Sequence, residues 1–351
     1  MKLKMAVIII VIMAYSVFDW AKTTPIKYDA NISDAVTGIS DLLKDVPRPM
    51  LDKNLYDQKM LMLANNPPTG TSSTSTIKTK WPVKAVYPNG GALLPFNRIV
   101  AYYGNFYSTK MGALGEYPPE EMKKRLLVEV AKWKEADPKT LVIPAIHYIV
   151  STAQGYAGDD GKYRLRMPDD QIQKAISLAN DIHGVVFLDV QVGLSNVQTE
   201  VPILEKYLKL PNVHLALDPE FSMKTGAKPG TVIGTMDAKD INYATNFLAD
   251  VVKKNNLDPK ILIIHRFTQN MVTNYKEIKP LPEVQIVMDM DGWGPPPNKI
   301  TTYKSFIQNE PVQFTGFKIF YKNDLKIKGS RMLTPKELMD LRPRPIYIQY
   351  Q

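Results

Sequence analysis

The most constraining feature of this sequence is a series of short, almost uninterrupted apolar runs that end in polar residues, between about residues 98 and 324. Continuous rather than alternating apolar runs are typical of parallel strands that are buried on both faces. Eight candidate strands follow from this pattern, at 99–103, 141–149, 185–192, 213–218, 231–235, 261–265, 284–291 and 315–321.

Helix signals alternate with these runs. Asp237 is a good N-cap, and Thr334, Pro335 and Glu337 together form a typical helix start. Proline followed by acidic residues opens two further helices, because proline and negative charge are favoured in a first turn. Helices are therefore expected at 118–135, 168–182, 199–209, 237–255 and 301–309, and from residue 333 onward.

Eight strands alternating with helices over about 250 residues predict an α/β fold, a (β/α)8 TIM-like barrel. A doubly wound sheet is the alternative, but the number of runs and their polar ends favour the barrel. The runs at 213–218 and 231–235 are so close that the helix between strands 4 and 5 would be atypical or missing. Residues 221–230 would then form a loop over the mouth of the barrel.

The N-terminal part is expected to lie outside the barrel domain, which is assigned to 81–351. Residues 1–21 combine a short basic start with an apolar stretch from 6 to 18, which predicts an export signal. A membrane span needs about 20 apolar residues, so both a cleaved signal peptide and an N-terminal membrane anchor stay open. Residues 22–80 are expected to be a partly helical segment and a Ser/Thr-rich linker. The protein is therefore expected to be exported, either extracellular or anchored on the outer face of the cytoplasmic membrane.

Composition excludes several classes of chemistry. Cysteine is absent, so disulfides, zinc–thiolate sites and a cysteine nucleophile are ruled out. The net charge is +9, but the basic residues are spread along the chain without interleaved aromatic residues, which is typical of a solvated surface. We expect no nucleic-acid partner, and neither a phosphate-binding loop nor a Gly-x-Ser-x-Gly elbow occurs.

Functional residues are expected at the carboxyl ends of the strands, where barrel enzymes build their active sites. Three polar pairs there are spaced two residues apart, so both members of each pair would share one face of a strand. Burying an unpaired charge is costly, which requires a compensating network or a function. The candidate catalytic residues are Glu220, Asp218, Asp289 and Asp291, and the candidate substrate-binding residues are Tyr102, Tyr103, His147, Asp189, Gln191, His265 and Trp293.

Two carboxyl groups, one protonated and one ionised, are the machinery of glycoside hydrolysis. Glu220, on the fourth run, is the candidate general acid, and Asp289 or Asp291, on the seventh, is the second carboxylate. The fourth and seventh strands of eight would lie on opposite sides of the ring, so a sugar could fit between them. Aromatic rings that could stack on it are Tyr102, Tyr103, Tyr148 and Trp293.

Two alternatives stay open beside the hydrolase of cell-wall or extracellular polysaccharide. One is a non-catalytic barrel that binds glycans or the cell envelope, and it would be favoured if the acids were buried and paired with Lys or Arg. The other is a metal-dependent hydrolase, with ligands from His147, His265, Asp289 and Asp218. No His-x-His or His-Glu-x-x-His spacing occurs, so we predict no metal and no other cofactor. The expected partners are a polysaccharide or other small polar ligand and the cell envelope.

The same residues carry a resemblance. The blocks at 113–116, 217–220, 233–242, 264–267 and 289–294 are similar to a family of uncharacterised exported bacterial barrel proteins, over roughly residues 95–310. This resemblance implies export and agrees with the choice of candidate residues, but it implies no reaction. The Asp-x-Glu at Asp218–Glu220 also resembles that of barrel-type lysozymes, which would make Glu220 the acid and Asp218 its partner.

Overall fold

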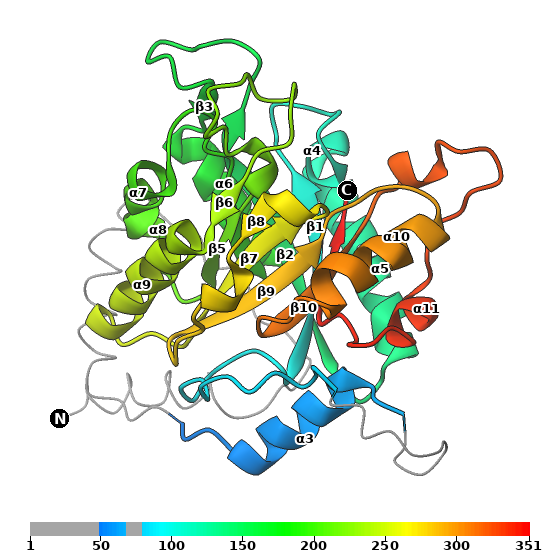
Figure 1. Cartoon of the computed structure of the whole chain (residues 1–351). Coiled ribbons are helices and arrows are strands. Elements are labelled where there is room, and N and C mark those ends of the chain that lie inside the picture. Colours follow the sequence, from blue (N-terminus) through cyan, green and yellow to red (C-terminus); the bar gives the residue numbers. More distant parts are fainter. Residues whose placement is uncertain (1–48, 68–78) are drawn as a thin grey trace, which may run out of the picture. The chain divides into compact units, whose positions relative to one another are not determined.

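Eight parallel strands close into a barrel in the computed structural model, which describes residues 49–67 and 79–351 (Figure 1). In ring order, β11 pairs with β1, β1 with β2, and the series continues through β4, β5, β7, β9 and β10 back to β11. The predicted (β/α)8 barrel is confirmed. The barrel strands are β1 (Asn97–Gly104), β2 (Leu141–Ala153), β4 (Val185–Val190), β5 (Val213–Leu217), β7 (Lys260–Arg266), β9 (Val284–Met290), β10 (Phe314–Ile319) and β11 (Tyr347–Tyr350).

One predicted strand is wrong and one barrel strand was not predicted. Residues 231–235 form a loop, with Val232 and Ile233 exposed. The eighth strand is instead β11, at the C-terminus. Its polar Gln349 interrupts the apolar run and the strand has only 4 residues, so it does not show the pattern of a buried strand. The strands after β5 consequently move one place round the ring, and β9 is the sixth barrel strand.

Most of the predicted helices are present. Asp237 caps α9 and Thr334 caps α11, each in a reciprocal capping box with the third helical residue. The segment expected at 199–209 is broken into short turns, and the one expected at 301–309 begins earlier and ends as a π-helix at Tyr303–Gln308. The helices are α4 (Ala113–Glu116), α5 (Pro119–Ala136), α6 (Asp169–Asp181), α7 (Val197–Glu200), α8 (Glu205–Leu208), α9 (Ala238–Lys254), α10 (Pro296–Thr302) and α11 (Pro335–Met339).

The irregular parts of the barrel lie on either side of β7. Residues 219–235, between β5 and α9, contain no α-helix, as the close spacing predicted. Between β7 and β9 the described chain has no α-helix either. It forms two 3-10 turns and the short strand β8 (Val272–Thr273), which pairs with β6 (Met236–Asp237). Strand β3 (Arg164–Arg166) is added antiparallel to the extended end of β2.

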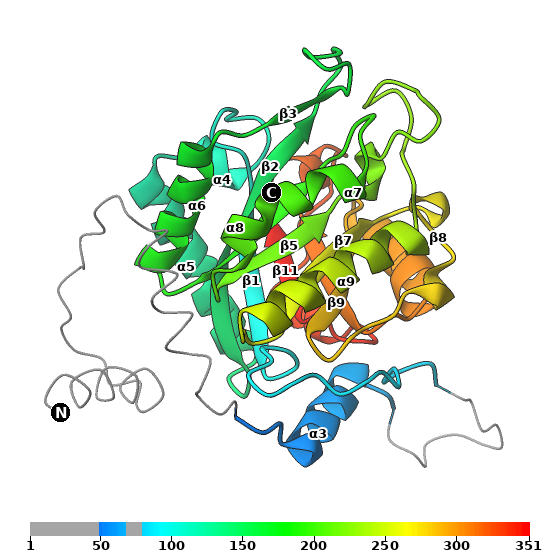
Figure 2. The ribbon, with the colours of Figure 1, turned by 90° about the vertical axis from the view of Figure 1, so that its left-hand side faces the viewer.

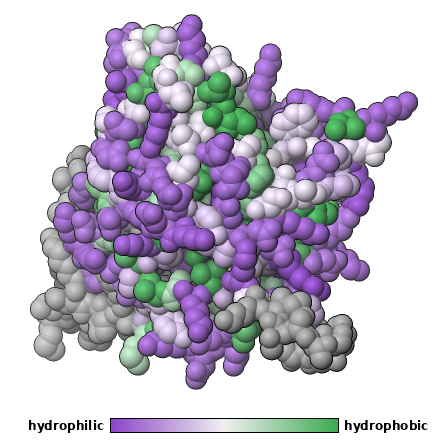
Figure 3. All heavy atoms as spheres, viewed as in Figure 1, coloured by the Kyte–Doolittle hydropathy of each residue, from purple (hydrophilic) through white to green (hydrophobic). Residues whose placement is uncertain are grey.

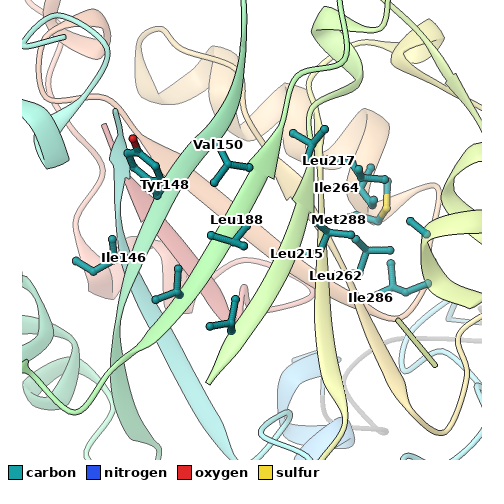
Figure 4. Packing of buried hydrophobic residues seen from close by; sticks show 14 of the residues in the cluster. Ile146, Tyr148, Val150, Leu188, Leu215, Leu217, Leu262, Ile264, Ile286 and Met288 are labelled. Atoms are coloured by element: carbon teal, nitrogen blue, oxygen red, sulfur yellow. The ribbon is translucent and has the colours of Figure 1, made fainter. Parts of the chain in front are cut away.

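Two apolar clusters hold the barrel together. The larger cluster lies between the strands and the surrounding helices, and Figure 4 shows its members Ile146, Leu188, Leu215 and Leu262 on neighbouring strands. Helices α6, α8 and α9 cover this outer face (Figure 2). The smaller cluster fills the amino-terminal half of the interior and includes Phe187, because alternate residues of a strand point to opposite faces. The outer surface of the molecule seen in Figure 3 is mostly hydrophilic, with separate apolar patches.

The helix α3 (Lys53–Ala64) packs with the inner cluster through Tyr56 and Met60. The backbone N–H of Arg344 donates to the carbonyl oxygen of Leu63 at 2.7 Å, which ties this helix to the segment before β11. Packing with the barrel therefore begins before residue 81, the expected start of the domain. The predicted signal or anchor at 1–21, the helical pattern at 32–43 and residues 68–78 of the linker lie outside the described residues. In the part of the chain that is described, no helix is both long and apolar enough to cross a membrane.

Replacing Ile348 with alanine tests the role of β11 in closing the barrel. Its side chain is fully buried in the outer cluster, so its truncation should lower the free energy of unfolding by about 2–5 kcal/mol. Leu141→Ala is the matched control, because Leu141 at the start of β2 is 72% exposed and should change stability by less than about 0.5 kcal/mol. Chemical denaturation measures both values, and equal effects of the two substitutions would contradict the assignment.

Candidate active site

Each barrel strand, or the residue directly after it, contributes at least one buried polar side chain to the carboxyl-terminal half of the interior. Register places Tyr103 beside His147, His265 beside Asp289, and Lys318 beside Gln349. Along each strand, every second residue points into the barrel. The inward residues near the amino end of the strands are apolar, and the inward residues that follow them near the carboxyl end are polar or charged. The full ring is Tyr103, His147, Asp189, Asp218, His265, Asp289, Lys318 and Gln349, and each is at most 4% exposed.

His265 lies at the centre of the charged groups. Its Nε2 is 3.5 Å from Oδ2 of Asp189, and its Nδ1 is 3.2 Å from Oδ2 of Asp291 and 3.5 Å from Oδ2 of Asp289. Burial alone would lower the pKa of this imidazole, but the negative charges of Asp189 and Asp291 outweigh burial and raise it well above its usual value. Burial would likewise raise the pKa of Asp189, and the positive charge of His265 lowers it instead.

His147 is held from one side by the last strand. Its Nδ1 is 2.6 Å from the hydroxyl of Tyr347 and 3.0 Å from Nε2 of Gln349, while its Nε2 is 3.5 Å from Oδ2 of Asp189. Burial lowers the pKa of His147 to about 4, so this imidazole is neutral at neutral pH. The two histidines therefore differ in charge although both face the same carboxylate.

Lys318 supplies the buried ammonium group of the site. Its Nζ is 2.9 Å from Oδ1 of Asp291 and lies 3.7 Å from the centre of the Tyr103 ring, a cation–π contact. Burial opposes ionisation of Asp291, but Lys318 and His265 lower its pKa below the usual range. Asp289 has no such lysine, and burial raises its pKa. Gly316, paired with Asp289 in register, leaves room for that carboxyl group, since a Cβ there would lie 2.4 Å from Oδ1.

Glu220 and Asp218 form a separate pair at the end of β5. A 3-10 turn at Pro219–Phe221 carries Glu220, and Oδ1 of Asp218 accepts the backbone N–H of Glu220 at 3.1 Å. Oδ2 of Asp218 accepts Nε2 of Gln191 at 3.1 Å. Glu220 is half-buried and has no ion-pair partner among the described residues. Burial, followed by the charge of Asp291, raises the pKa of Glu220 to about 7, and burial raises that of Asp218 as well.

The loop at 219–235 folds back onto the turn that carries Glu220. The backbone N–H of Gly234 donates to the carbonyl oxygen of Glu220 at 2.6 Å, and that of Thr235 donates to Ser222 at 3.1 Å. A Cβ on Gly234 would lie 2.6 Å from three backbone atoms, so only glycine fits this approach. Residues 221–230 therefore form a loop without an α-helix, as expected, and the segment taken for a strand is its returning arm.

The structure does not bring all the predicted residues together. Tyr102 is on the outer face of the barrel, where its hydroxyl lies 3.1 Å from that of Tyr321, so the expected stacking role is wrong for this ring. Tyr148 also points outward and stacks on Phe106. Trp293 follows β9 in a loop and is 52% exposed, with Nζ of Lys326 at 5.1 Å from its ring.

The relative position of the two carboxylate strands also needs correction. Strands β5 and β9 flank β7 in the ring, rather than lying on opposite sides of it. This brings the end of β5 nearer to Asp291 than a half-ring spacing would. It explains how the charge of Asp291 can act on the pKa of Glu220.

Sequence reasoning assigned no role to three residues of the site. Lys318 was visible at a strand end, but a lone lysine there gives no sign of its carboxylate partner. Tyr347 and Gln349 were missed because β11 was missed. Their alternation at 347 and 349 behind a Pro-rich segment is the signal that could have found them.

No family model and no curated protein matches the chain. Solved structures with a related arrangement include a GH18 chitinase from Pseudoalteromonas aurantia, which is 10% identical with a TM-score of 0.33, over 72% of this chain and 93% of that one. The alkaline cellulase K catalytic domain is 11% identical with a TM-score of 0.35, over 73% of each chain. Dihydropteroate synthase from Burkholderia cenocepacia is 9% identical with a TM-score of 0.32, over 73% of this chain and 86% of that one. Likeness at this level assigns neither activity nor substrate.

Substituting Gly234 tests whether the returning arm fixes the turn of Glu220. Gly234→Ala should lower the free energy of unfolding by about 1–3 kcal/mol, because the new Cβ overlaps backbone atoms that cannot move independently. Gly155→Ala is the control, since a Cβ there has no atom within 4 Å. Denaturation together with limited proteolysis of residues 219–235 measures the effect. An unchanged cleavage pattern and stability in Gly234→Ala would show that the arm does not depend on this contact.

Proposed function

We propose that this chain is an exported glycoside hydrolase that acts on a cell-wall or extracellular polysaccharide. The observation that carries the proposal is a pair of carboxyl groups at the carboxyl end of the barrel whose surroundings shift their pKa values in opposite directions. The pKa of Glu220 is raised to about 7, while Lys318 holds Asp291 as a carboxylate by a 2.9 Å ion pair. Environments that separate two carboxyl groups in this way assign one as acid and the other as base or nucleophile.

Glu220 would act as the general acid. A protonated carboxyl group donates its proton to the oxygen of the scissile glycosidic bond as that bond breaks. The group must reach the substrate, and Glu220 is the member of the carboxyl set that is half-buried rather than sealed. Asp218 would act as a positioning residue, because its carboxylate accepts the backbone N–H of Glu220 and does not reach the surface.

Asp291 would be the second carboxylate, acting on the anomeric carbon either directly or through a water molecule. Asp289 is the weaker choice of the two. It is the inward residue two positions before Asp291, it is completely buried, and its pKa is raised. The ion pair with Lys318 keeps Asp291 charged, and a charged group is needed to stabilise an oxocarbenium-like transition state.

Sugar binding would rest mainly on Trp293. It is exposed in the loop directly after Asp291, so a sugar ring stacked on its indole would have the bond to be cleaved near that carboxylate. Tyr103, His147, Asp189, Gln191 and His265 are buried, which favours a role in holding the carboxyl groups rather than in direct stacking. The export signal predicted from the sequence at 1–21 would agree with an extracellular or membrane-anchored location and a polysaccharide of the cell envelope.

A non-catalytic glycan- or envelope-binding barrel is the second candidate. The observation that favours it is the pairing of Asp291 with a buried lysine, together with the complete burial of Asp289 and Asp218. Such a network is also what a purely structural set of charges would make. The two candidates assign different roles to Glu220, which has no cation in contact within the described part of the chain. A hydrolase needs this carboxyl group as a proton donor, whereas a binding protein does not.

Glu220→Gln separates these candidates. In a hydrolase the amide cannot donate a proton to the leaving oxygen, so kcat on a cleaved glycan should fall by about 10²–10⁴-fold with little change in binding. Glu205→Gln is the control, because Glu205 pairs with Lys209 on the surface of α8 and should leave turnover unchanged. Release of reducing ends from a panel of envelope polysaccharides measures the rate. Equal turnover in the wild type and Glu220→Gln would sink the assignment of the acid.

The raised pKa of Glu220 also predicts a pH dependence. Between the usual value of 4.5 and about 7, the folded chain keeps a proton on Glu220 that the unfolded chain has released. The contribution of this group to the free energy of unfolding therefore falls as the pH rises through that interval. Relative to Glu220→Gln, the wild type should lose stability between about pH 4.5 and about pH 7, as measured by chemical denaturation. Hydrolysis should decline above about pH 7, where Glu220 in the folded chain loses its proton. A flat difference in stability between the two proteins across the interval would contradict the shift.

A further inference from the structure

We propose that His147, Asp189 and His265 bind a divalent transition-metal ion, preferentially Zn²⁺, in the interior of the barrel. The three side chains come from β2, β4 and β7, and one ligand atom of each lies within 4.8 Å of the others. All three are completely buried. Two imidazole nitrogens and one carboxylate oxygen are a donor set that suits zinc, with a fourth position for a water or a substrate oxygen.

The distances within this set are longer than those of a direct charge-assisted hydrogen bond and match those between two ligands of one metal ion. Oδ2 of Asp189 is 3.5 Å from Nε2 of His147 and 3.5 Å from Nε2 of His265. A charge-assisted hydrogen bond between these groups would measure about 2.7–2.9 Å. Donors bound at about 2.0–2.1 Å to one tetrahedral ion are separated by about 3.3–3.5 Å, by simple geometry. The carboxylate thus keeps an equal, non-bonded distance to both rings.

The ligand atoms also lack other partners. Oδ2 of Asp189, Nε2 of His147 and Nε2 of His265 make no hydrogen bond within the described residues, although all are buried. A buried polar atom without a partner costs about 1–3 kcal/mol, and here several such atoms face one another. A bound cation would satisfy them together, with release of the proton that Asp189 and Asp291 otherwise favour on His265. Hydrogen bonding between them at the observed distances would not.

Surrounding residues orient the ligands as a metal site requires. Nδ1–H of His147 can donate to the hydroxyl of Tyr347 at 2.6 Å, and that tautomer leaves the lone pair of Nε2 directed at Asp189. Nδ1 of His265 lies 3.2 Å from the carboxylate of Asp291, in the arrangement of a carboxylate–histidine–metal triad. The Nδ1 atom of each imidazole, on the side of the ring away from the proposed metal, therefore contacts a group from another strand or the residue directly after it.

The proposed metal site is distinct from the proposed catalytic acid. Glu220 is not among the ligands and lies on the turn after β5, at the margin of the ring. Metal binding can therefore succeed or fail as a proposal independently of glycan hydrolysis. It would also place a positive charge beneath the residues that are proposed to meet the substrate.

The test uses the full chain, stripped of metal with a chelator and then titrated with Zn²⁺ in a calorimeter. The wild type should bind one equivalent, and the metal content after dialysis should be one zinc per chain. Asp189→Asn should abolish stoichiometric binding, and Tyr347→Phe should weaken it by about 10–100-fold through loss of orientation. Glu220→Gln should bind zinc like the wild type even where hydrolysis is lost.

His183→Asn is the matched control. His183 is exposed in the turn before β4, and its φ of 51° is one that asparagine tolerates, so this variant should keep one equivalent of zinc. Equal binding by Asp189→Asn and His183→Asn would overturn the proposal, as would a wild type that binds no zinc. If Asp189→Asn does not fold, Co²⁺ added to the stripped wild type decides. An absorption spectrum typical of tetrahedral Co²⁺ that zinc displaces would support the site, and its absence would exclude it.

Discussion

The constraint on which the structure depends is the excess of carboxyl groups inside a closed barrel. Asp189, Asp218, Asp289 and Asp291 are buried there, and Glu220 lies at their edge, while Lys318 is the only lysine or arginine that forms an ion pair with any of them in the described chain. Charges in such an interior are costly unless they are paired or neutralised. Protonation, the imidazolium of His265 or a bound cation must therefore balance the rest.

This excess links the two proposals physically. Burial and, after it, the negative charge of Asp291 raise the pKa of Glu220. The same excess of carboxylates surrounds His265 and makes the interior attractive to a cation. The raised pKa of Glu220 and the attraction of the interior for a cation therefore have one structural origin. Alternation along the strands delivers the side chains, and closure of the barrel by β11 excludes the water that would otherwise solvate them.

Much of this arrangement could be predicted from the sequence. Seven of the eight barrel strands were visible as apolar runs because both faces of each are buried, and Asp237 and Thr334 marked their helices because capping is a local interaction. The inward direction of Asp189, Asp218 and Asp289 followed from a spacing of two. The predictions that failed depended on contacts between residues that are distant along the chain. The strand β11 is recognisable only by its pairing with β1 and β10, and 231–235 looks like a strand because its exposed Val232 and Ile233 resemble buried residues.

The position of each strand around the ring could not be predicted from the sequence either. One false strand before β7 displaced every later strand by one place. The prediction therefore put Asp291 on the far side of the barrel from β5, whereas β9 is separated from β5 by β7 alone. Tyr102 failed for another reason, since the residue next to an inward Tyr103 must point outward. Pair contacts such as that of Lys318 with Asp291 join residues on neighbouring strands that are distant along the chain, and no local pattern encodes them.

The network itself argues for a function rather than for stability alone. Replacing a buried set of charges with apolar residues of similar size is often neutral or stabilising, so a barrel that needed only to fold would gain nothing from this one. Glu220 makes the argument sharper, because it is half-buried beside a like charge and has no cation in contact within the described residues. Gly234 folds the returning arm of the loop onto its turn, so the carboxyl group is held in that unfavourable place by the backbone. A carboxyl group that is kept destabilised and partly accessible is suited to give up a proton to a ligand, which a structural charge has no need to do.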